Sequence, residues 1–290
     1  MTDQRNRHEK DALAEVLALL DLETVKDDVF QAQSPEGRVQ RVYGGQVLGQ
    51  ALTAATRTVD VSRICHSLHG YFLRPGDPRA PITYEVDRSR DGHSFTVRRV
   101  VAMQNGKQIF ILAASFQTPE PGFDHQFEMP KVPSPEQLED EREALRKTKT
   151  ELPEALRAWL TRAQPFETRP VVLDPPGDRP ARPPYDNVWF RATGPVPPEK
   201  TRPLLAFASD ATLLSTALLP HGKSVLSGLQ VASLDHAMWF HRDFAFDDWL
   251  LYAQDSPSAS GARGFSRGAI FTRDGKLIAS VAQEGLIRAR

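Results

Sequence analysis

The densest cluster of chemically capable side chains lies in Gln230–Arg242, which reads QVASLDHAMWFHR. The segment begins as a β-type run and then brings Asp235, His236 and His241 together among aromatic residues. Carboxylates and imidazoles are the usual groups for moving protons. Because a strand sends alternate side chains to opposite faces, one set could enter a core and the other a site. The alternative is a buried strand whose histidines are satisfied, and the pattern alone leaves both interpretations open.

Three further polar residues of the second half stand at ends or edges of predicted elements. Asp210 lies where an apolar helix over Leu204–Leu219 is entered, Ser233 lies on a predicted strand, and Gln283 lies near the end of the last strand. Taken alone, Asp210 is best explained as an N-cap, since carboxylates favour that position. Taken alone, Ser233 and Gln283 do not indicate a functional site.

The composition places bounds on the class of protein. The chain has 290 residues, 40% hydrophobic and 25% charged, with a formal net charge of −1, which allows one large domain or two ordinary ones. That charge gives no general attraction to nucleic acid or anionic membranes. The amino terminus lacks the apolar core of a signal peptide, and no run approaches the roughly 20 apolar residues of a membrane span. We therefore expect a cytoplasmic protein without a nucleic-acid partner or a membrane span.

The cysteine and histidine content argues against metal chemistry. The single cysteine, Cys65, excludes an internal disulfide and a cysteine-based zinc cluster, and its apolar surroundings favour a small buried residue over a nucleophile. His66 and His69 are three apart, so on a strand they face opposite sides and do not form a metal pair. No metal and no cofactor is expected.

The first half alternates between helix and strand patterns. Asp11–Glu23 predicts a short amphipathic helix, and Asp28–Val42 predicts two strands around a turn. Gly44-Gly45 leads into Val47–Ala55, which is small and apolar nearly all round, as in a helix buried on most sides. The glycines let a group approach the backbone at the positive end of that helix. Four strands follow, separated by turns: Ile64–Leu73, Pro81–Arg88, Ser94–Gln104 and Lys107–Gln117.

The middle of the chain breaks this pattern. Thr118–Lys200 holds 16 of the 23 prolines, which is typical of a connector. Within it, Glu136–Arg162 is helical in pattern, and Thr168–Asp174 and Val188–Thr193 predict strands. We therefore expect a connector with some structure of its own.

The last part of the chain repeats the first. The apolar helix Leu204–Leu219 is again followed by strands, and matched phenylalanines recur: Phe72 with Phe240, and Phe95 with Phe265, at offsets of 168 and 170 positions. Such offsets indicate an internal duplication. A long helix wrapped by an antiparallel sheet, made twice, is an α+β tandem hot-dog. The predicted units are an amino-terminal hot-dog (1–118), the connector (119–200) and a carboxy-terminal hot-dog (201–290) that carries the site.

Several long strings make the chain resemble the type II acyl-CoA thioesterases, the bacterial and peroxisomal double-hot-dog family. The similarity extends over nearly the whole chain. It is densest in Gly44–Val47, Tyr71–Gly76, Arg90–Phe95, Leu234–His241 and Ala262–Phe265.

The resemblance implies a function and a site. The family hydrolyses fatty acyl-CoA thioesters, and its catalytic Asp, Thr or Ser, and Gln fall on Asp210, Ser233 and Gln283. Asp210 would be the base, and Ser233, standing where bacterial members usually carry Thr, would orient the water together with Gln283. Amides at a helix amino terminus would help to stabilise the oxyanion. The corresponding first-half positions are Gly-Gly, roughly Cys65 and roughly Ala114, which form no comparable set.

The resemblance also implies an acyl-CoA substrate, with medium to long chains expected, and a homo-oligomer, either dimer or tetramer. Two alternatives share the fold: a double-hot-dog enoyl-CoA hydratase, whose Asp-x-x-x-x-His pair after a glycine is not found, and a non-catalytic acyl-CoA sensor, which would be expected to lose part of the Asp/Ser/Gln set. A serine-hydrolase triad is disfavoured, on the expectation that the chain holds no Gly-x-Ser-x-Gly elbow.

Overall fold

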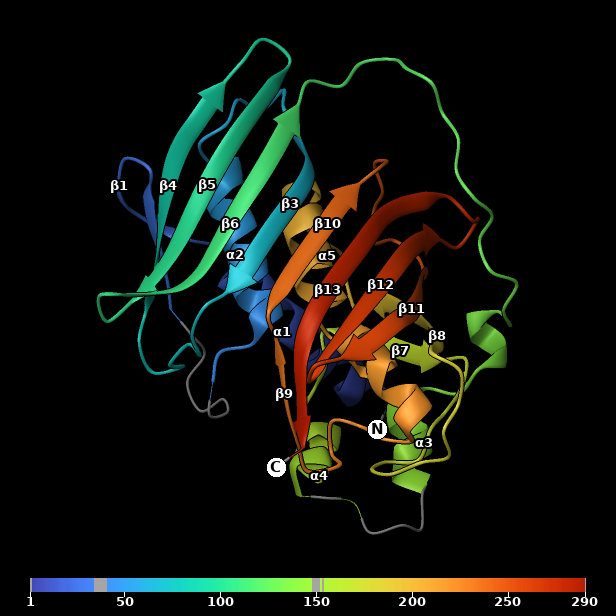
Figure 1. Ribbon diagram of the computed structural model, residues 1–290. Coiled ribbons are helices and arrows are strands. Elements are labelled where there is room, and N and C mark those ends of the chain that lie inside the picture. Colours follow the sequence, from blue (N-terminus) through green and yellow to red (C-terminus); the bar gives the residue numbers. More distant parts are fainter. Residues whose placement is uncertain (1, 34–40, 148–151, 153, 290) are drawn as a thin grey trace.

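A computed structural model describes residues 2–33, 41–147, 152 and 154–289. Part of the predicted strand pair Asp28–Val42 lies outside these residues. The dominant feature is one large antiparallel sheet with helices gathered on one of its faces (Figure 1). The strands are β1 (Glu23–Lys26), β2 (Val29–Ala32), β3 (Ile64–Phe72), β4 (Ile82–Asp91), β5 (Phe95–Gln104), β6 (Lys107–Gln117), β7 (Phe166–Pro170), β8 (Tyr185–Ala192), β9 (Leu229–Ser233), β10 (Asp235–Phe240), β11 (Leu250–Ser260), β12 (Arg263–Thr272) and β13 (Leu277–Ala289).

Among the described residues, the helices are fewer than the strands. They are α1 (Thr2–Leu19), α2 (Gly44–Thr56), α3 (Glu141–Lys147), α4 (Glu154–Thr161) and α5 (Thr201–Ser209), with 3₁₀ segments η1 (Pro135–Gln137), η2 (Pro198–Lys200) and η3 (Leu213–His221). The sequence prediction of a helical Glu136–Arg162 thus corresponds to η1, α3 and α4.

The strand order is β1-β2-β4-β5-β6-β3-β10-β13-β12-β11-β8-β7, with β9 pairing beside β13. The β5–β6 hairpin turns at Asn105-Gly106, where both residues have positive φ (49° and 71°), as the Asn-Gly pair predicts. At the centre, β3 and β10 are hydrogen-bonded to each other and join the two halves of the sheet (Figure 1). The helices α2 and α5 lie behind this junction.

The segment 119–200 is more than a connector, because it contributes two strands to the sheet. β8 pairs with β11, and β7 pairs with β8, so both strands extend the carboxy-terminal half of the sheet. The strands predicted over Thr168–Asp174 and Val188–Thr193 are thus present, with shifted bounds, as β7 and β8. Residues 118–134 instead run as an extended strap around the molecule (Figure 1).

The helices α2 and α5 pack directly against each other, and glycines allow the contact. A Cβ on Gly45 would lie 2.3 Å from the Phe207 carbonyl oxygen, and one on Gly49 would lie 2.8 Å from that of Pro203. Because Gly45 meets Phe207 and Gly49 meets Pro203, the two helices run antiparallel. The amino terminus of α2 is therefore placed at the carboxy terminus of α5.

Two predicted elements are interrupted. The helix predicted over Leu204–Leu219 is wrong as a single unit, because α5 ends at Ser209 and a 3₁₀ segment begins at Leu213. Thr212, with φ −120°, breaks the helical path between them. The strand predicted over Gln230–Arg242 is split at Leu234 into β9 and β10. Both interruptions lie beside the candidate site.

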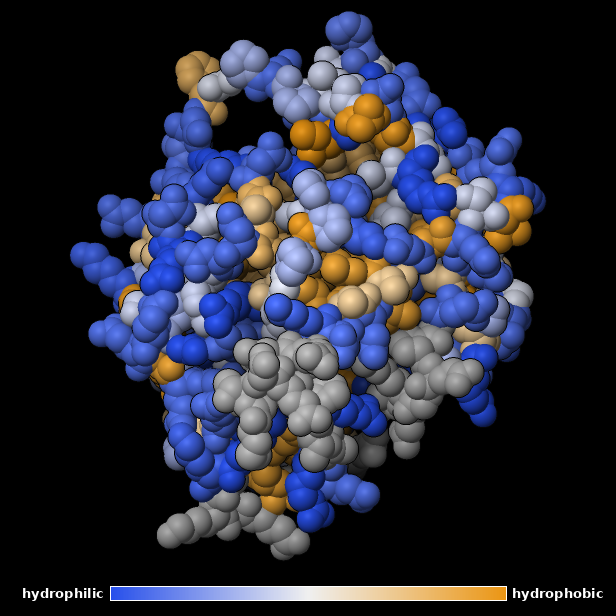
Figure 2. Space-filling model, turned by 180° about the vertical axis from the view of Figure 1, so that it is seen from behind, coloured by the Kyte–Doolittle hydropathy of each residue, from blue (hydrophilic) through white to orange (hydrophobic). Residues whose placement is uncertain are grey.

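Apolar side chains form one main core between the helices and the sheet, with Leu48, Leu52, Leu68 and Phe110 fully buried in it. The stretch Pro198–His221 is long and apolar enough to cross a membrane, but most of it is buried, as in the core helix of a globular protein. Seen from the helix-bearing side, apolar side chains also reach the surface across the middle of the molecule (Figure 2).

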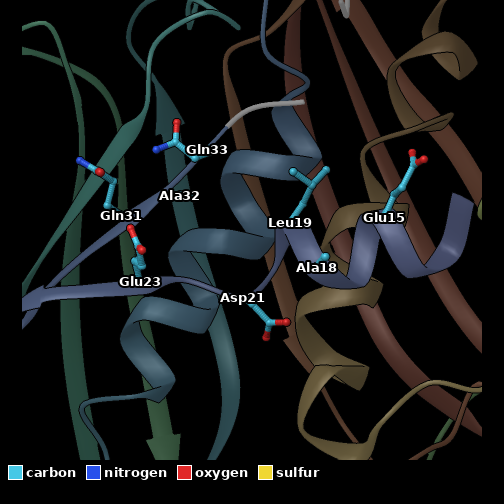
Figure 3. Close-up of a pocket in the computed structure, with 8 residues that line it drawn as sticks. All are labelled: Glu15, Ala18, Leu19, Asp21, Glu23, Gln31, Ala32 and Gln33. Atoms are coloured by element: carbon cyan, nitrogen blue, oxygen red, sulfur yellow. The ribbon is translucent and has the colours of Figure 1, made fainter. Parts of the chain in front are cut away.

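A surface hollow lies between the end of α1 and the strands β1 and β2 (Figure 3). Its lining includes the carboxylates of Glu15, Asp21 and Glu23 together with Leu19 and Gln31. Three carboxylates would repel an anionic ligand. The hollow shares no lining residue with the site described below.

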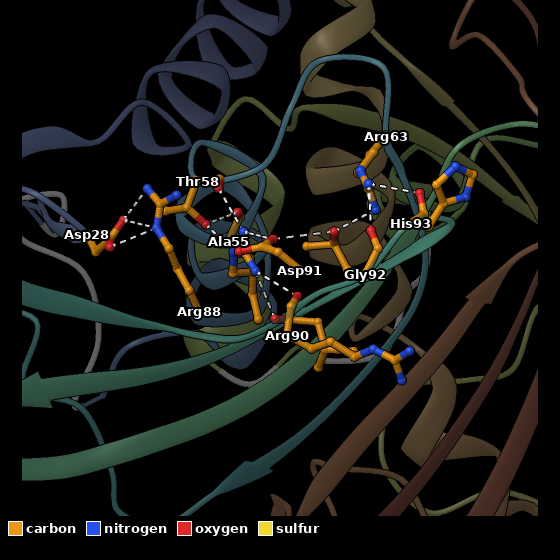
Figure 4. A network of polar contacts seen from close by, with 12 residues as sticks. Asp28, Ala55, Thr58, Arg63, Arg88, Arg90, Asp91, Gly92 and His93 are labelled. Carbon is orange, nitrogen blue, oxygen red and sulfur yellow. Dashed lines mark hydrogen bonds and ion pairs between the residues drawn. The ribbon is translucent and has the colours of Figure 1, made fainter.

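Thr58 and Asp91 belong to the polar network of Figure 4, beside the carboxy-terminal end of α2. A buried arginine, Arg98 of β5, hydrogen-bonds both residues. Its guanidinium donates to the Thr58 hydroxyl (2.9 Å) and carbonyl (3.1 Å) and to the Asp91 carboxylate (2.6 Å). Several donors in one rigid group tie the end of the helix to two strands. These hydrogen bonds anchor the carboxy-terminal end of α2 to the sheet.

Candidate active site

The carboxylate of Asp210 is the centre of a buried polar cluster. Asp210 is the C-cap residue of α5, so the prediction that it begins a helix is wrong: the apolar pattern runs on past the true end of α5. The helix amino terminus that Asp210 meets is that of α2. A Cβ on Gly44 would lie 2.7 Å from Asp210 Oδ2, and the backbone N–H of Gly45 donates a hydrogen bond to the carboxylate.

The other two predicted site residues hydrogen-bond the same oxygen. Ser233 Oγ donates to Asp210 Oδ1 at 3.2 Å, and Gln283 Nε2 donates to it at 2.6 Å. Ser233 ends β9, and Gln283 lies within β13, fully buried. The structure thus brings together three residues that are 23 and 73 positions apart in the chain.

Burial dominates the electrostatics of Asp210. Loss of solvent raises the pKa of this carboxyl to about 6, although hydrogen bonds from Gln283, Ser233 and the Gly45 amide favour the charged form and oppose the shift. A carboxyl with such a pKa is ionised at neutral pH and can still accept a proton. It has the properties of a general base.

Two tyrosines flank the Asp210 carboxylate, and the hydroxyl of each donates a hydrogen bond to a backbone carbonyl. Tyr43 donates its hydroxyl hydrogen to the Phe207 carbonyl (2.9 Å), and Tyr252 donates to that of Ser209 (3.1 Å). Burial, with a further contribution from the negative Asp210, raises the pKa of the Tyr252 hydroxyl well above the usual range, whereas Tyr43 is 36% exposed. Tyr252 therefore stays neutral.

A buried histidine, which the sequence left ambiguous, also faces Asp210. His236 of β10 is fully buried, with Nδ1 4.0 Å from Asp210 Oδ1 and Nε2 2.9 Å from Ser209 Oγ. Burial lowers the pKa of this imidazole to about 3, so it is neutral. The density of polar residues in Gln230–Arg242 was the available signal, but the pattern did not show which histidine turns inward.

The expectation that the chain contains no Gly-x-Ser-x-Gly motif was wrong, because Gly264-Phe265-Ser266-Arg267-Gly268 matches it. That absence was the argument against a serine nucleophile. The structure gives a different argument against a serine nucleophile. The string lies inside β12, not at a strand-to-helix turn, and Ser266 is fully buried. Both glycines serve packing: a Cβ on Gly268 would lie 2.2 Å from the Tyr252 ring.

Comparison with solved structures identifies the fold. A protein with a hot-dog fold from Alicyclobacillus acidocaldarius matches with a TM-score of 0.77 at 19% identity, over 95% of this chain and 98% of that one. An acyl-CoA thioesterase II, TesB2, from Mycobacterium marinum matches with a TM-score of 0.78 at 41% identity, again over 95% and 98%. The large antiparallel sheet and its helices are thus an α+β hot-dog fold.

Sequence comparisons identify the family. The family model for acyl-CoA thioesterase matches residues 160–286, and that for the acyl-CoA thioesterase N-terminal domain matches 33–117. Acyl-CoA thioesterase 2 of Haemophilus influenzae is 42% identical over 96% of this chain and 98% of its own. Human acyl-coenzyme A thioesterase 8 is 40% identical over 95% of this chain and 89% of its own. The chain belongs to the type II acyl-CoA thioesterase family, and is thus a thioester hydrolase, as the sequence predicted.

Proposed function

We propose that this chain hydrolyses fatty acyl-CoA thioesters by direct attack of a water molecule that Asp210 activates. The water oxygen bonds to the thioester carbonyl carbon and gives its proton to the Asp210 carboxylate. The carbon–sulfur bond then breaks, and the proton passes to the departing thiolate, which leaves a fatty acid and CoA. No covalent intermediate is required. The observation that supports this most is the buried carboxylate of Asp210, which both predicted partners hydrogen-bond.

The neighbours of Asp210 take defined roles in this proposal. Ser233 and Gln283 orient the carboxylate and the water. The first-turn amide of Gly45 donates to Asp210, and the other first-turn amides of α2, which have no acceptor within their own helix, stabilise the developing oxyanion. Gly44 carries no side chain, which leaves space against Asp210 Oδ2. Apolar surface on the helix-bearing face (Figure 2) suits an acyl chain of medium to long length.

We further infer that the chain is a tandem hot-dog produced by duplication. From the centre outward, one half of the sheet reads β3-β6-β5-β4-β2-β1 and the other β10-β13-β12-β11-β8-β7, with matching chain order. This correspondence supports a carboxy-terminal unit that begins near Phe166, earlier than residue 201. Assembly into a dimer or tetramer and a cytoplasmic location are further proposals, the first of which light scattering of the purified protein tests.

The test is CoA release from saturated acyl-CoAs of graded chain length by the natural chain and by Asp210→Asn. We expect steady release that falls by roughly a hundredfold or more in the variant. Release that survives the substitution would move the base elsewhere. Tight binding without release would favour the acyl-CoA sensor, and hydration of an enoyl-CoA without CoA release would favour the hydratase.

A further inference from the structure

The imidazole of His236 is a buried polar group beside Asp210 that the proposed mechanism leaves unused. It comes from β10, between the central strand β3 and the strand that carries Gln283. Its Nδ1 lies 4.0 Å from Asp210 Oδ1, and this buried atom has no hydrogen-bond partner among the described residues. A fully buried polar atom without a partner costs free energy, so its position calls for a functional reason.

The hydrogen bonds around Ser209 determine which imidazole nitrogen carries the proton. The hydroxyl of Ser209 has one hydrogen, and both the Ala206 carbonyl (3.0 Å) and the Met238 sulfur (3.3 Å) lie where they can accept it. The same oxygen lies 2.9 Å from His236 Nε2 and therefore accepts a hydrogen from it. The network thus assigns the proton to Nε2 and leaves a lone pair on Nδ1, 4.0 Å from Asp210 Oδ1, about 1 Å longer than a hydrogen bond.

Two acceptors therefore face each other while Asp210 is ionised, and they become a donor and an acceptor once Asp210 is protonated. We propose, on the basis of the hydrolytic function above, that His236 is a positioning residue whose Nδ1 accepts a hydrogen bond from the Asp210 carboxyl after that carboxyl has taken the proton of the attacking water. The proton stays bonded to Asp210 until it passes to the thiolate. His236 remains neutral throughout.

The other titratable groups that face Asp210 do not fill this role. Tyr43 at the start of α2 and Tyr252 on β11 both interact electrostatically with the carboxylate, but their hydroxyl hydrogens go to the carbonyls of Phe207 and Ser209. Gln283 and Ser233 are donors to Asp210 Oδ1. Among these neighbours, His236 presents an acceptor to the protonated acid.

Two substitutions separate the two nitrogens of His236. In His236→Gln the amide reaches the place of Nε2 and can still bond Ser209, but nothing accepts at the place of Nδ1. In His236→Asn a carbonyl oxygen can stand near the place of Nδ1. We expect kcat to fall roughly tenfold in the Gln variant, with KM unchanged, and to be largely retained in the Asn variant. Thermal unfolding of both variants serves as the control for folding.

The pH profile distinguishes this role from a merely structural one. A hydrogen bond to the protonated form raises the pKa of an acid, so its loss in His236→Gln should move the acidic limb of the activity profile to lower pH. An unchanged limb would overturn the proposal. A limb moved to higher pH would also overturn it, because it would show that Nδ1 donates to the carboxylate.

A measurement without substrate separates this inference from the function it rests on. Infrared titration of the Asp210 carboxyl, with its band assigned by Asp210→Asn, reports the same shift in the free protein. If the natural chain releases no CoA while the band still titrates at lower pH in His236→Gln, the hydrolytic function fails and the contact stands. If CoA is released but the band does not move, the function stands and the role of His236 fails.

Discussion

Gln283 Nε2 lies 2.6 Å from Asp210 Oδ1, which joins the last strand of the sheet to the end of α5. Gln283 is fully buried, and its hydrogen bond favours the charged form of the carboxyl. The contact holds the carboxylate at the amino terminus of α2, beside Ser233. The position of the proposed base therefore depends on three separate elements of the fold.

Replacement of Gln283 by Met keeps a side chain of similar size but removes the donor. We expect kcat to fall by roughly tenfold to a hundredfold, since one fixed donor at a buried charge is lost. Because this hydrogen bond favours the charged form of Asp210, the acidic limb of the pH profile should move to higher pH, opposite to the effect of His236→Gln. Steady-state kinetics across pH measures both. A variant with natural kcat would remove Gln283 from the site.

The pH dependence of kcat/KM in the natural chain follows from the pKa of Asp210, which burial raises to about 6. The base must be ionised, so kcat/KM should rise with pH through about 6 and then level off. Below that pH, it should fall about tenfold per pH unit. A profile that stays flat down to pH 4.5, about one and a half units below this pKa, would contradict the assignment of Asp210 as the base.

Stability should show the cost of keeping Asp210 charged in the interior. Its pKa is higher in the folded chain than its ordinary value of 3.8, so the folded state binds more protons, and this group destabilises the fold increasingly from about pH 4 to about pH 6. Asp210→Asn should therefore be more stable than the natural chain at pH 8, on the order of 1 to 3 kcal/mol, with the advantage shrinking towards pH 4. Denaturant unfolding at the two pH values measures this difference. An advantage that does not change with pH would contradict it.

The paired glycines at the start of α2 should differ in what they support. A Cβ on Gly44 meets the Asp210 carboxylate, whereas one on Gly45 meets the backbone oxygen of Phe207. Gly44→Ala should therefore lower kcat with a small change in Tm. Gly45→Ala should lower Tm, because the two helices would have to separate. Steady-state kinetics and thermal unfolding of both variants test this distinction. A Gly44→Ala variant with the same kcat as the unsubstituted chain would refute it.

Much of this architecture was predictable from local sequence. The Asn105-Gly106 turn and the alternation in β5 and β6 indicated a hairpin that the structure contains. The end of α5 was not predictable in this way, because Leu204–Leu219 is apolar on both sides of Asp210 and burial conceals the break. Periodicity predicts an element from its own residues, and a helix buried on all sides lacks a contrasting polar face.

The three site residues were predicted from the family resemblance, not from their spacing. Their neighbours were harder to find. The helix terminus that meets Asp210 belongs to α2, more than 150 positions away, and depends on the close approach of Gly45 to Phe207. The inward turn of His236 depends on the pairing of β10 between β3 and β13. Contacts between segments so distant are set by tertiary packing, which a local pattern does not contain.

The central claim is that Asp210 activates water and does not itself attack the thioester. A single turnover in H₂¹⁸O, with the enzyme in excess over acyl-CoA, tests it most directly. The account predicts heavy oxygen in the fatty acid and none in the peptide that contains Asp210. Heavy oxygen in Asp210, with unlabelled fatty acid, would show that the carboxylate attacked first and would contradict the account.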